Sequence, residues 1–166
     1  LLAATGRPEP GRVAYEAART LGERVNDVAI QAEALAELGA TNIALARQKE
    51  ARAALAQAIE LARTSGHRRA EADATNMLGI LFANLGEPAD SERNYTAALA
   101  LRRDIDDEVG AAQCTSNLGA LSNTLGEYRR ALGYFDDALA VRRRLGLAQA
   151  TANTLHNLGV ARANLG

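Results

Sequence analysis

The sequence repeats itself every 40 residues from one end to the other. When the chain is aligned with itself at this offset, no insertion or deletion is needed. A Leu-Gly pair recurs in register four times, at Leu38-Gly39, Leu78-Gly79, Leu118-Gly119 and Leu158-Gly159. Repetition at a fixed period of roughly 20–50 residues is the signature of solenoids and other repeat architectures. We therefore expect the chain to fold as stacked copies of one small unit.

The composition predicts that this unit is helical. The 166 residues include 37 Ala and 23 Leu, but only 6 Val and 5 Ile, and aromatic residues make up 4%. Alanine and leucine favour helices, whereas strands are enriched in β-branched and aromatic residues. The predicted fold class is therefore all-α.

Two columns of the self-alignment mark where helices end. One contains only Asn, Gly and Asp, which best tolerate the left-handed backbone that follows a helix C-terminus. It consists of Asn26, Gly66, Asp106 and Gly146. The other is mostly glycine, at Gly6, Ala46, Gly86, Gly126 and Gly166. Each period then holds two helices of roughly 17 residues, about 25 Å long. We expect A helices near 28–45, 68–85, 108–125 and 148–165, and B helices near 8–24, 48–64, 88–104 and 128–144.

The columns divide residues 1–166 into a single array of units. The predicted boundaries are a partial unit at 1–26, full units at 27–66, 67–106 and 107–146, and a partial unit at 147–166. Both ends fall inside a unit, and the sequence has no starting Met. Because repeat arrays normally end in polar capping units, we expect this chain to be a fragment of a longer array.

Glycine recurs inside the predicted A helices, where it costs about 1 kcal/mol relative to alanine. Gly79, Gly119 and Gly159 occupy the same place in successive units. A cost repeated in every unit indicates a packing reason. We expect close crossings of helices at these glycines.

The columns together resemble the tetratricopeptide repeat. One unit reads Leu118-Gly119, Leu125-Gly126, Ala131, Phe135 and Ala138, and the preceding one is similar. The resemblance implies a right-handed α-solenoid of antiparallel helix pairs, with A helices lining the concave surface. The period of 40 exceeds the family's usual length of about 34. This long variant resembles arrays in bacterial signalling and transcription-regulator proteins and, more distantly, kinesin light chains, which implies a bacterial, cytoplasmic protein.

The sequence offers no catalytic, cofactor-binding or metal-binding constellation. His67 and His156 lie in different units, and neither has a neighbour at metal-ligand spacing. Cys114 shares its column with Ala34, Ala74 and Thr154, which favours a small packing residue over a reactive thiol. No glycine-rich phosphate-binding motif occurs. We therefore expect that the chain is not an enzyme and uses no cofactor.

Arginines gather near the ends of the B helices. Arg63, Arg103 and Arg143 share a column, and Arg102, Arg142 and Arg144 lie beside it. Such a stripe could attract nucleic acid, but acidic residues follow it at once and no base-stacking aromatic residues lie nearby. With a net charge of -1, a solvated arginine stripe is the favoured interpretation. We expect no direct nucleic-acid partner and, without an apolar run near 18 residues, no membrane partner.

The resemblance implies a concave groove at positions -6, -3, -2, +1, +4 and +5 from each Leu-Gly glycine. Its polar and charged members are Asp73, Asn76, Asn84, Gln113, Ser116, Asn117, Asn123, Asn153, His156, Asn157 and Asn164. An Asn amide both donates and accepts hydrogen bonds, which suits it to a peptide backbone. The predicted function is a non-catalytic scaffold that binds a peptide or protein segment in this groove.

Two alternatives stay open. The polar groove residues could be ordinary solvated surface, and the array could be a structural spacer or oligomerisation segment of a larger bacterial regulator. The last predicted helix carries Leu155 and Leu158 without a following B helix. Because exposed apolar faces favour association, end-to-end self-association through the uncapped terminal helices is also expected.

Overall fold

The computed structural model describes residues 8–166, and these form eight helices without a strand. The A helices are α2 (Val28–Ala44), α4 (Arg68–Asn84), α6 (Glu108–Thr124) and α8 (Ala148–Leu165). The B helices are α1 (Pro8–Arg24), α3 (Gln48–Ser65), α5 (Pro88–Asp104) and α7 (Tyr128–Arg144). Every helix agrees with its predicted range to within one residue, and the all-α prediction is confirmed. Gly6 and the start of the predicted first unit lie outside the described residues.

The left-handed turns fall where the column of Asn, Gly and Asp predicts them. At the ends of the B helices, Asn26, Gly66, Asp106 and Gly146 have φ angles between 53° and 76°. The A helices end in the same way at Gly86 and Gly126, but the equivalent Ala46 adopts φ 56°, where a Cβ is strained. These turns return the chain on itself, so neighbouring helices are antiparallel.

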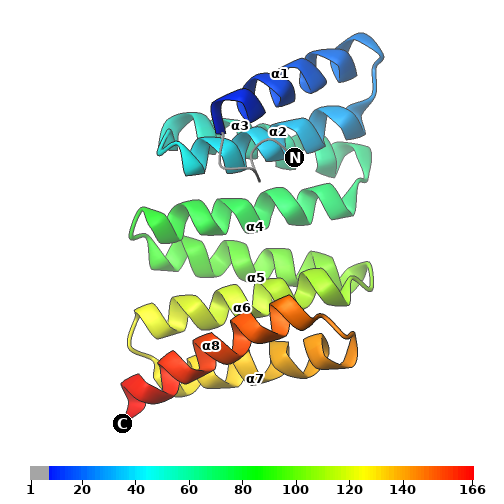
Figure 1. Cartoon of the computed structure of the whole chain (residues 1–166). Coiled ribbons are helices and arrows are strands. Elements are labelled where there is room, and N and C mark those ends of the chain that lie inside the picture. The colour runs from blue at the N-terminus through cyan, green and yellow to red at the C-terminus, as the bar shows by residue number, and fades with distance from the viewer. Residues whose placement is uncertain (1–7) are drawn as a thin grey trace.

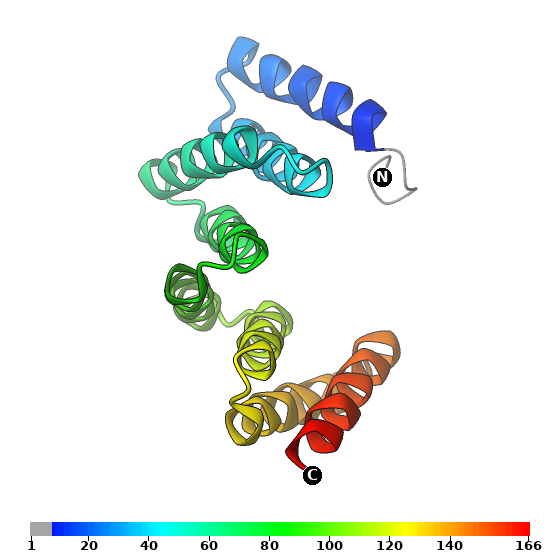
Figure 2. The ribbon, with the colours of Figure 1, turned by 90° about the vertical axis from the view of Figure 1, so that its left-hand side faces the viewer.

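The helices stack in chain order into a bent array (Figure 1). Each helix packs against the next one along the chain, and each A helix also contacts the A helix of the following unit. No comparable contact joins successive B helices within residues 8–166. Figure 2 looks along the middle helices and shows α4 and α6 on the inner side of the bend, with α5 on the outer side. The A helices therefore form the concave layer of the α-solenoid.

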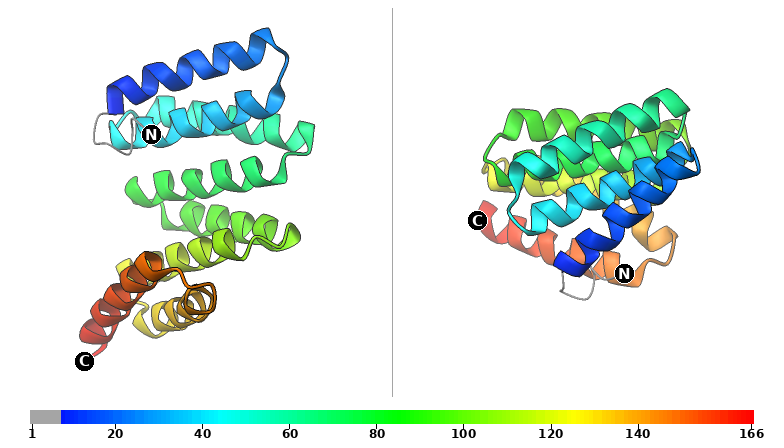
Figure 3. Two further views of the ribbon diagram at one scale, coloured as in Figure 1. Left: turned by 45° about the vertical axis from the view of Figure 1, so that its right-hand side comes forward. Right: turned by 90° about the horizontal axis from the view of Figure 1, so that it is seen from above.

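The array also twists from one end to the other. Figure 3 shows that α1 and α8, at its two ends, run in different directions. This twist is typical of solenoids, in which each unit is slightly rotated relative to the previous one.

The predicted close crossings are confirmed at Gly79 and Gly119, and Gly39, at the same position one unit earlier, shows a third. A Cβ added at Gly39, Gly79 or Gly119 would lie 2.5, 2.6 or 2.8 Å from a large side chain of the following B helix. These side chains are Leu55, Tyr95 and Phe135, and all three are buried. The prediction is wrong at Gly159, where an added Cβ would meet no atom within 4 Å of it. The glycines thus admit one large side chain per unit into the core between A and B helices.

Candidate binding surface

Most of the polar residues predicted for the groove reach solvent on the A helices. The structure leaves partly or fully exposed Asp73, Asn84, Gln113, Asn117, Asn123, Asn153, His156, Asn157 and Asn164. They lie on α4, α6 and α8, which belong to the inner layer of the array (Figure 2). These nine side chains are therefore accessible on the inner layer of helices, and their role in binding stays a prediction.

Two predicted groove residues are instead buried between A helices. Asn76 and Ser116, at position -3, are only 7% and 6% exposed. Both lie on A helices that contact the following A helix, whereas His156, at the same position in the last helix, is exposed. The assignment of Asn76 and Ser116 to an open groove is corrected accordingly. Position -3 serves the packing of one unit on the next.

A line of hydrogen bonds joins several of these amides across three helices. The Arg142 guanidinium donates to Gln113 Oε1 at 3.3 Å, and Gln113 Nε2 donates to Asn117 Oδ1 at 3.2 Å. Asn117 Nδ2 in turn donates to Asn76 Oδ1 at 2.9 Å. Part of the hydrogen-bonding capacity of Gln113 and Asn117 is thus used inside the array. These two amides thus link α4, α6 and α7 through hydrogen bonds.

Cys114 is buried beside this chain of hydrogen bonds, and its thiol is unreactive. Its side chain is buried, with Sγ 3.6 Å from Asn76 Oδ1. Burial raises the pKa of the Cys114 thiol to about 11. Because the thiolate is the reactive form of cysteine, the protonated thiol is a poor nucleophile at neutral pH. The predicted packing role is confirmed.

Two arginines of the predicted solvated stripe are buried, which corrects that part of the prediction. Arg102 and Arg142 are 7% and 6% exposed, whereas Arg103 and Arg143 beside them are exposed. The self-alignment already indicated that these two arginines are buried. Arg102 and Arg142 share their column with Ala62, a small residue that is fully buried.

The buried Arg102 is held by carboxylates. It forms ion pairs with Asp107, whose side chain is as buried as its own, and with the half-exposed Asp73. Asp107 is also the N-cap of α6, where it accepts a hydrogen bond from the Gly110 amide at 2.9 Å. Burial alone would raise the pKa of Asp107. The Gly110 hydrogen bond and the contact with Arg102 outweigh burial and hold the pKa below its ordinary value.

Arg142 occupies the same place one unit later but contacts only neutral groups among the described residues. It donates to the Thr154 hydroxyl, to Gln113 Oε1, and to the carbonyls of Ala112 and Ala150. Burial lowers the pKa of Arg142, since no carboxylate compensates for the lost hydration. The two buried arginines therefore hold equivalent units together by different electrostatics.

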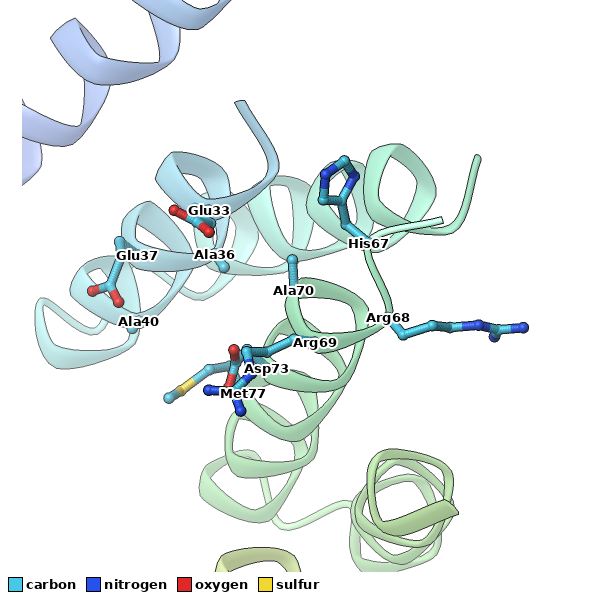
Figure 4. A pocket seen from close by; sticks show the side chains of 10 residues that line it. All are labelled: Glu33, Ala36, Glu37, Ala40, His67, Arg68, Arg69, Ala70, Asp73 and Met77. Carbon is cyan, nitrogen blue, oxygen red and sulfur yellow. The ribbon is translucent and has the colours of Figure 1, made fainter. Parts of the chain in front are cut away.

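A hollow of about 460 Å³ opens between α2 and α4, and we call it the α2–α4 pocket (Figure 4). Asp73 is the one predicted groove residue in its lining. The pocket also takes Glu33, Ala36, Glu37 and Ala40 from α2. The sequence prediction did not include these four residues, because its groove positions begin in the unit 67–106 and leave out the unit 27–66. Counting the same offsets from Gly39 finds all of them.

A smaller hollow of about 160 Å³ lies between α6 and α8, above the Phe135 ring of α7, and we call it the α6–α8 pocket. It brings together Asn123 and Asn157, two predicted residues from successive units, with Ala120 and Val160 beside them. Asn123 Oδ1 is buried and has no hydrogen-bond partner among residues 8–166. The pocket therefore combines apolar walls with amides from two units.

The described part of the chain supplies no metal centre and no membrane span. Between residues 8 and 166, no three His, Cys, Asp or Glu side chains cluster in a way that could hold a metal ion. None of the eight helices is both long and apolar enough to cross a bilayer.

Comparisons with known proteins agree with this geometry. Residues 68–144 match the model of the tetratricopeptide repeat family. BtubC (BKLC) from P. vanneervenii superposes with a TM-score of 0.77 at 20% identity, over 93% of this chain and 65% of that one. A Rap protein solved in complex with Competence and Sporulation Factor gives 0.71 at 14% identity, over 98% of this chain and 52% of that one.

The two structural neighbours support the fold alone, because their sequence identities are low. The chain spans less than two thirds of the length of either. Among curated proteins, none matches the sequence. The family match over 68–144, together with the same helix pair recurring on both sides of it, confirms the predicted resemblance. Residues 68–144 match the tetratricopeptide repeat family, and residues 8–166 form one helical array in which the same helix pair continues on both sides of the matched part.

Proposed function

We propose that the chain is a non-catalytic scaffold that binds a peptide or protein segment along its concave face. The observation that carries the proposal is the position of the α2–α4 and α6–α8 pockets among the hollows of the described residues. Both lie between successive A helices, and both are lined by residues at the groove offsets. An extended segment about 25 Å long, or roughly eight residues, could engage more than one unit at once.

In this proposal, the amides of the groove bind the peptide backbone and its apolar residues contact the peptide side chains. Asn123 and Asn157 offer donors and acceptors to the backbone of the bound segment, while Ala120 and Val160 contact its side chains. Asn153, Asn164 and Asn84 extend the amide surface along the A helices. The Rap neighbour, which was solved with a bound factor, is consistent with such a use of the fold. The bacterial, cytoplasmic setting stays a prediction.

A pair of matched double variants tests the proposal. Ala120→Arg with Val160→Arg places two long side chains in the α6–α8 pocket, both at exposed positions one unit apart. We expect this concave variant to lose the peptides that the parent selects from a random-peptide phage library. The control is Ala100→Arg with Ala140→Arg, at exposed positions one unit apart on the B helices α5 and α7. Equal binding by both variants, with circular dichroism showing both folded, would count against a concave site.

A second candidate function is assembly with another copy of the chain. Leu155 is 45% exposed on α8, although the equivalent Leu35 and Thr75 are buried, and Gly159 lacks the large side chain that covers the other repeated glycines. Tyr15 of α1 occupies the repeat position of Leu55, Tyr95 and Phe135. In this proposal, α1 of a second copy packs on α8 with Tyr15 over Gly159, and the array acts as a spacer or oligomerisation segment.

Sedimentation measured over a range of protein concentrations tests this assembly. We expect the mass of the parent to rise with concentration and Leu155→Glu to stay monomeric, because a carboxylate would be buried in the contact. Val109→Glu, at a similarly exposed position on α6, is the control and should associate like the parent. A parent that is monomeric at every concentration would contradict the proposal.

A further inference from the structure

The charges around the α2–α4 pocket do not balance. Glu33 and Glu37 lie side by side on α2 at the edge of the pocket, and both are exposed (Figure 4). Neither forms an ion pair with any of residues 8–166 that the structure describes. The remaining charged side chains of the lining belong to α4 and to the turn before it.

The charged side chains on the α4 side are already occupied. Arg68 pairs with Glu71 at 3.4 Å and points away from α2, and Arg69 lies 3.6 Å from Asp107. Asp73 pairs with the buried Arg102. These contacts neutralise one another within α4, α5 and the start of α6. The net charge that the pocket presents to a ligand therefore comes from Glu33 and Glu37.

The two glutamates also repel each other. They are four residues apart on one helix, and like charges at this spacing destabilise a helix. Burial raises the pKa of Tyr15, and the neighbouring Glu37 carboxylate raises it further, so Tyr15 stays a neutral phenol and supplies no counter-charge to Glu37. A cation placed between the carboxylates would remove this repulsion and gain two charge-assisted contacts.

The floor of the pocket suits the stem of a long cationic side chain. It is formed by Ala36, Ala40, Ala70 and Met77, all apolar and mostly small. Arginine and lysine bury their methylene stems along apolar surface while the charged head stays at a polar edge. The volume of about 460 Å³ exceeds that of one such side chain. The pocket thus offers apolar contact below and paired carboxylates at its edge.

We infer that the α2–α4 pocket binds an arginine or lysine side chain of a partner's segment. This inference rests on the proposed function, since it names what the N-terminal half of the same concave face recognises. The cation lies between Glu33 and Glu37, and its stem lies on Ala36, Ala40 and Met77. Selectivity comes from charge at this end of the array, whereas the α6–α8 pocket is lined by amides and apolar groups.

Peptide selection followed by affinity measurement tests the inference. Peptides are selected from a random phage library on the parent chain, synthesised with a fluorescent label, and titrated with parent and variants by fluorescence polarisation. We expect the selected peptides to be enriched in Arg or Lys. Glu33→Gln with Glu37→Gln should weaken their binding by about tenfold or more, and added salt should weaken the parent's binding as it screens the contact.

The control removes two carboxylates elsewhere. Asp136→Asn with Asp137→Asn changes the net charge equally, at two exposed residues of α7, and should leave affinity unchanged. The inference would be overturned if the selected peptides lacked basic residues. It would also be overturned if they bound the double glutamine variant and the double asparagine variant with equal affinity. If those peptides were still lost in the Ala120→Arg, Val160→Arg variant, the proposed function would survive. If no peptide were selected at all, both would fall.

Discussion

Phe135→Ala is expected to lower the free energy of unfolding by about 3–5 kcal/mol, among the largest losses of any single substitution in this chain. The ring is 1% exposed and packs with Ala131, Leu139, Leu158 and Ala161. It also fills the space that Gly119 leaves open. Alanine would leave a cavity, because α6 and α7 already cross too closely to move together and fill it. Urea unfolding followed by circular dichroism measures the loss.

The repeat supplies a matched control for this substitution. Tyr15 holds the same position in α1 but is only partly buried. Tyr15→Ala removes a ring of similar size, and we expect a clearly smaller loss because less apolar surface returns to water. Equal losses at the two positions would show that burial between A and B helices does not set the stability of a unit.

Arg102→Met is expected to cost about 3–5 kcal/mol, because it leaves the Asp107 carboxylate buried without its main counter-charge. The side chains of Arg102 and Asp107 are each 8% exposed. Methionine keeps much of the length and apolar contact of the arginine stem, so the loss reports on charge rather than on packing. Guanidinium chloride would screen the ion pair, so unfolding by urea is the appropriate measurement.

Arg142→Met is the control one unit later, and we expect a much smaller effect. Arg142 is equally buried, but its partners within the described residues are neutral. Its removal therefore leaves no buried carboxylate without a counter-charge. Burial of an uncompensated charge is itself unfavourable, and methionine relieves it. A loss at Arg142 as large as that at Arg102 would contradict this electrostatic account.

The difference between Arg102→Met and the parent should also depend on pH. The pKa of Asp107 is held below its ordinary value in the folded chain. The stabilisation is therefore fully present above the pKa of the unfolded chain, near 4, and is lost as the pH falls through the lower folded value. We expect the two proteins to converge in stability below about pH 4.

The fold could be predicted from the sequence because each local signal for a turn or a helix crossing recurs in register, with a period of 40 residues. A single Asn26 or Asp106 would be an ambiguous turn signal. Aligned with Gly66 and Gly146, they identify a position that requires positive φ, which the structure shows at all four. The glycines at helix crossings were predictable for the same reason, since a locally unfavourable residue recurred in register.

The binding surface was less predictable, because residue type does not reveal which neighbour a side chain meets. Asn76 and Asn157 are both amides on A helices, yet one is buried under the next A helix and the other lines a pocket. Burial of Arg102 and Arg142 depended on contacts between helices that arginine composition does not encode. The column shared with Ala62 was the available signal.

Site-specific photo-crosslinking tests the central claim, that a protein segment binds the concave face, most directly. A photoreactive amino acid is placed either at Val160, in the α6–α8 pocket, or at Ala140, exposed on the B helix α7. Each protein is irradiated with a labelled peptide selected by the parent chain. We expect crosslinks from Val160 and none above background from Ala140. Crosslinks from Ala140 alone, or equal yields from both positions, would contradict a concave binding site.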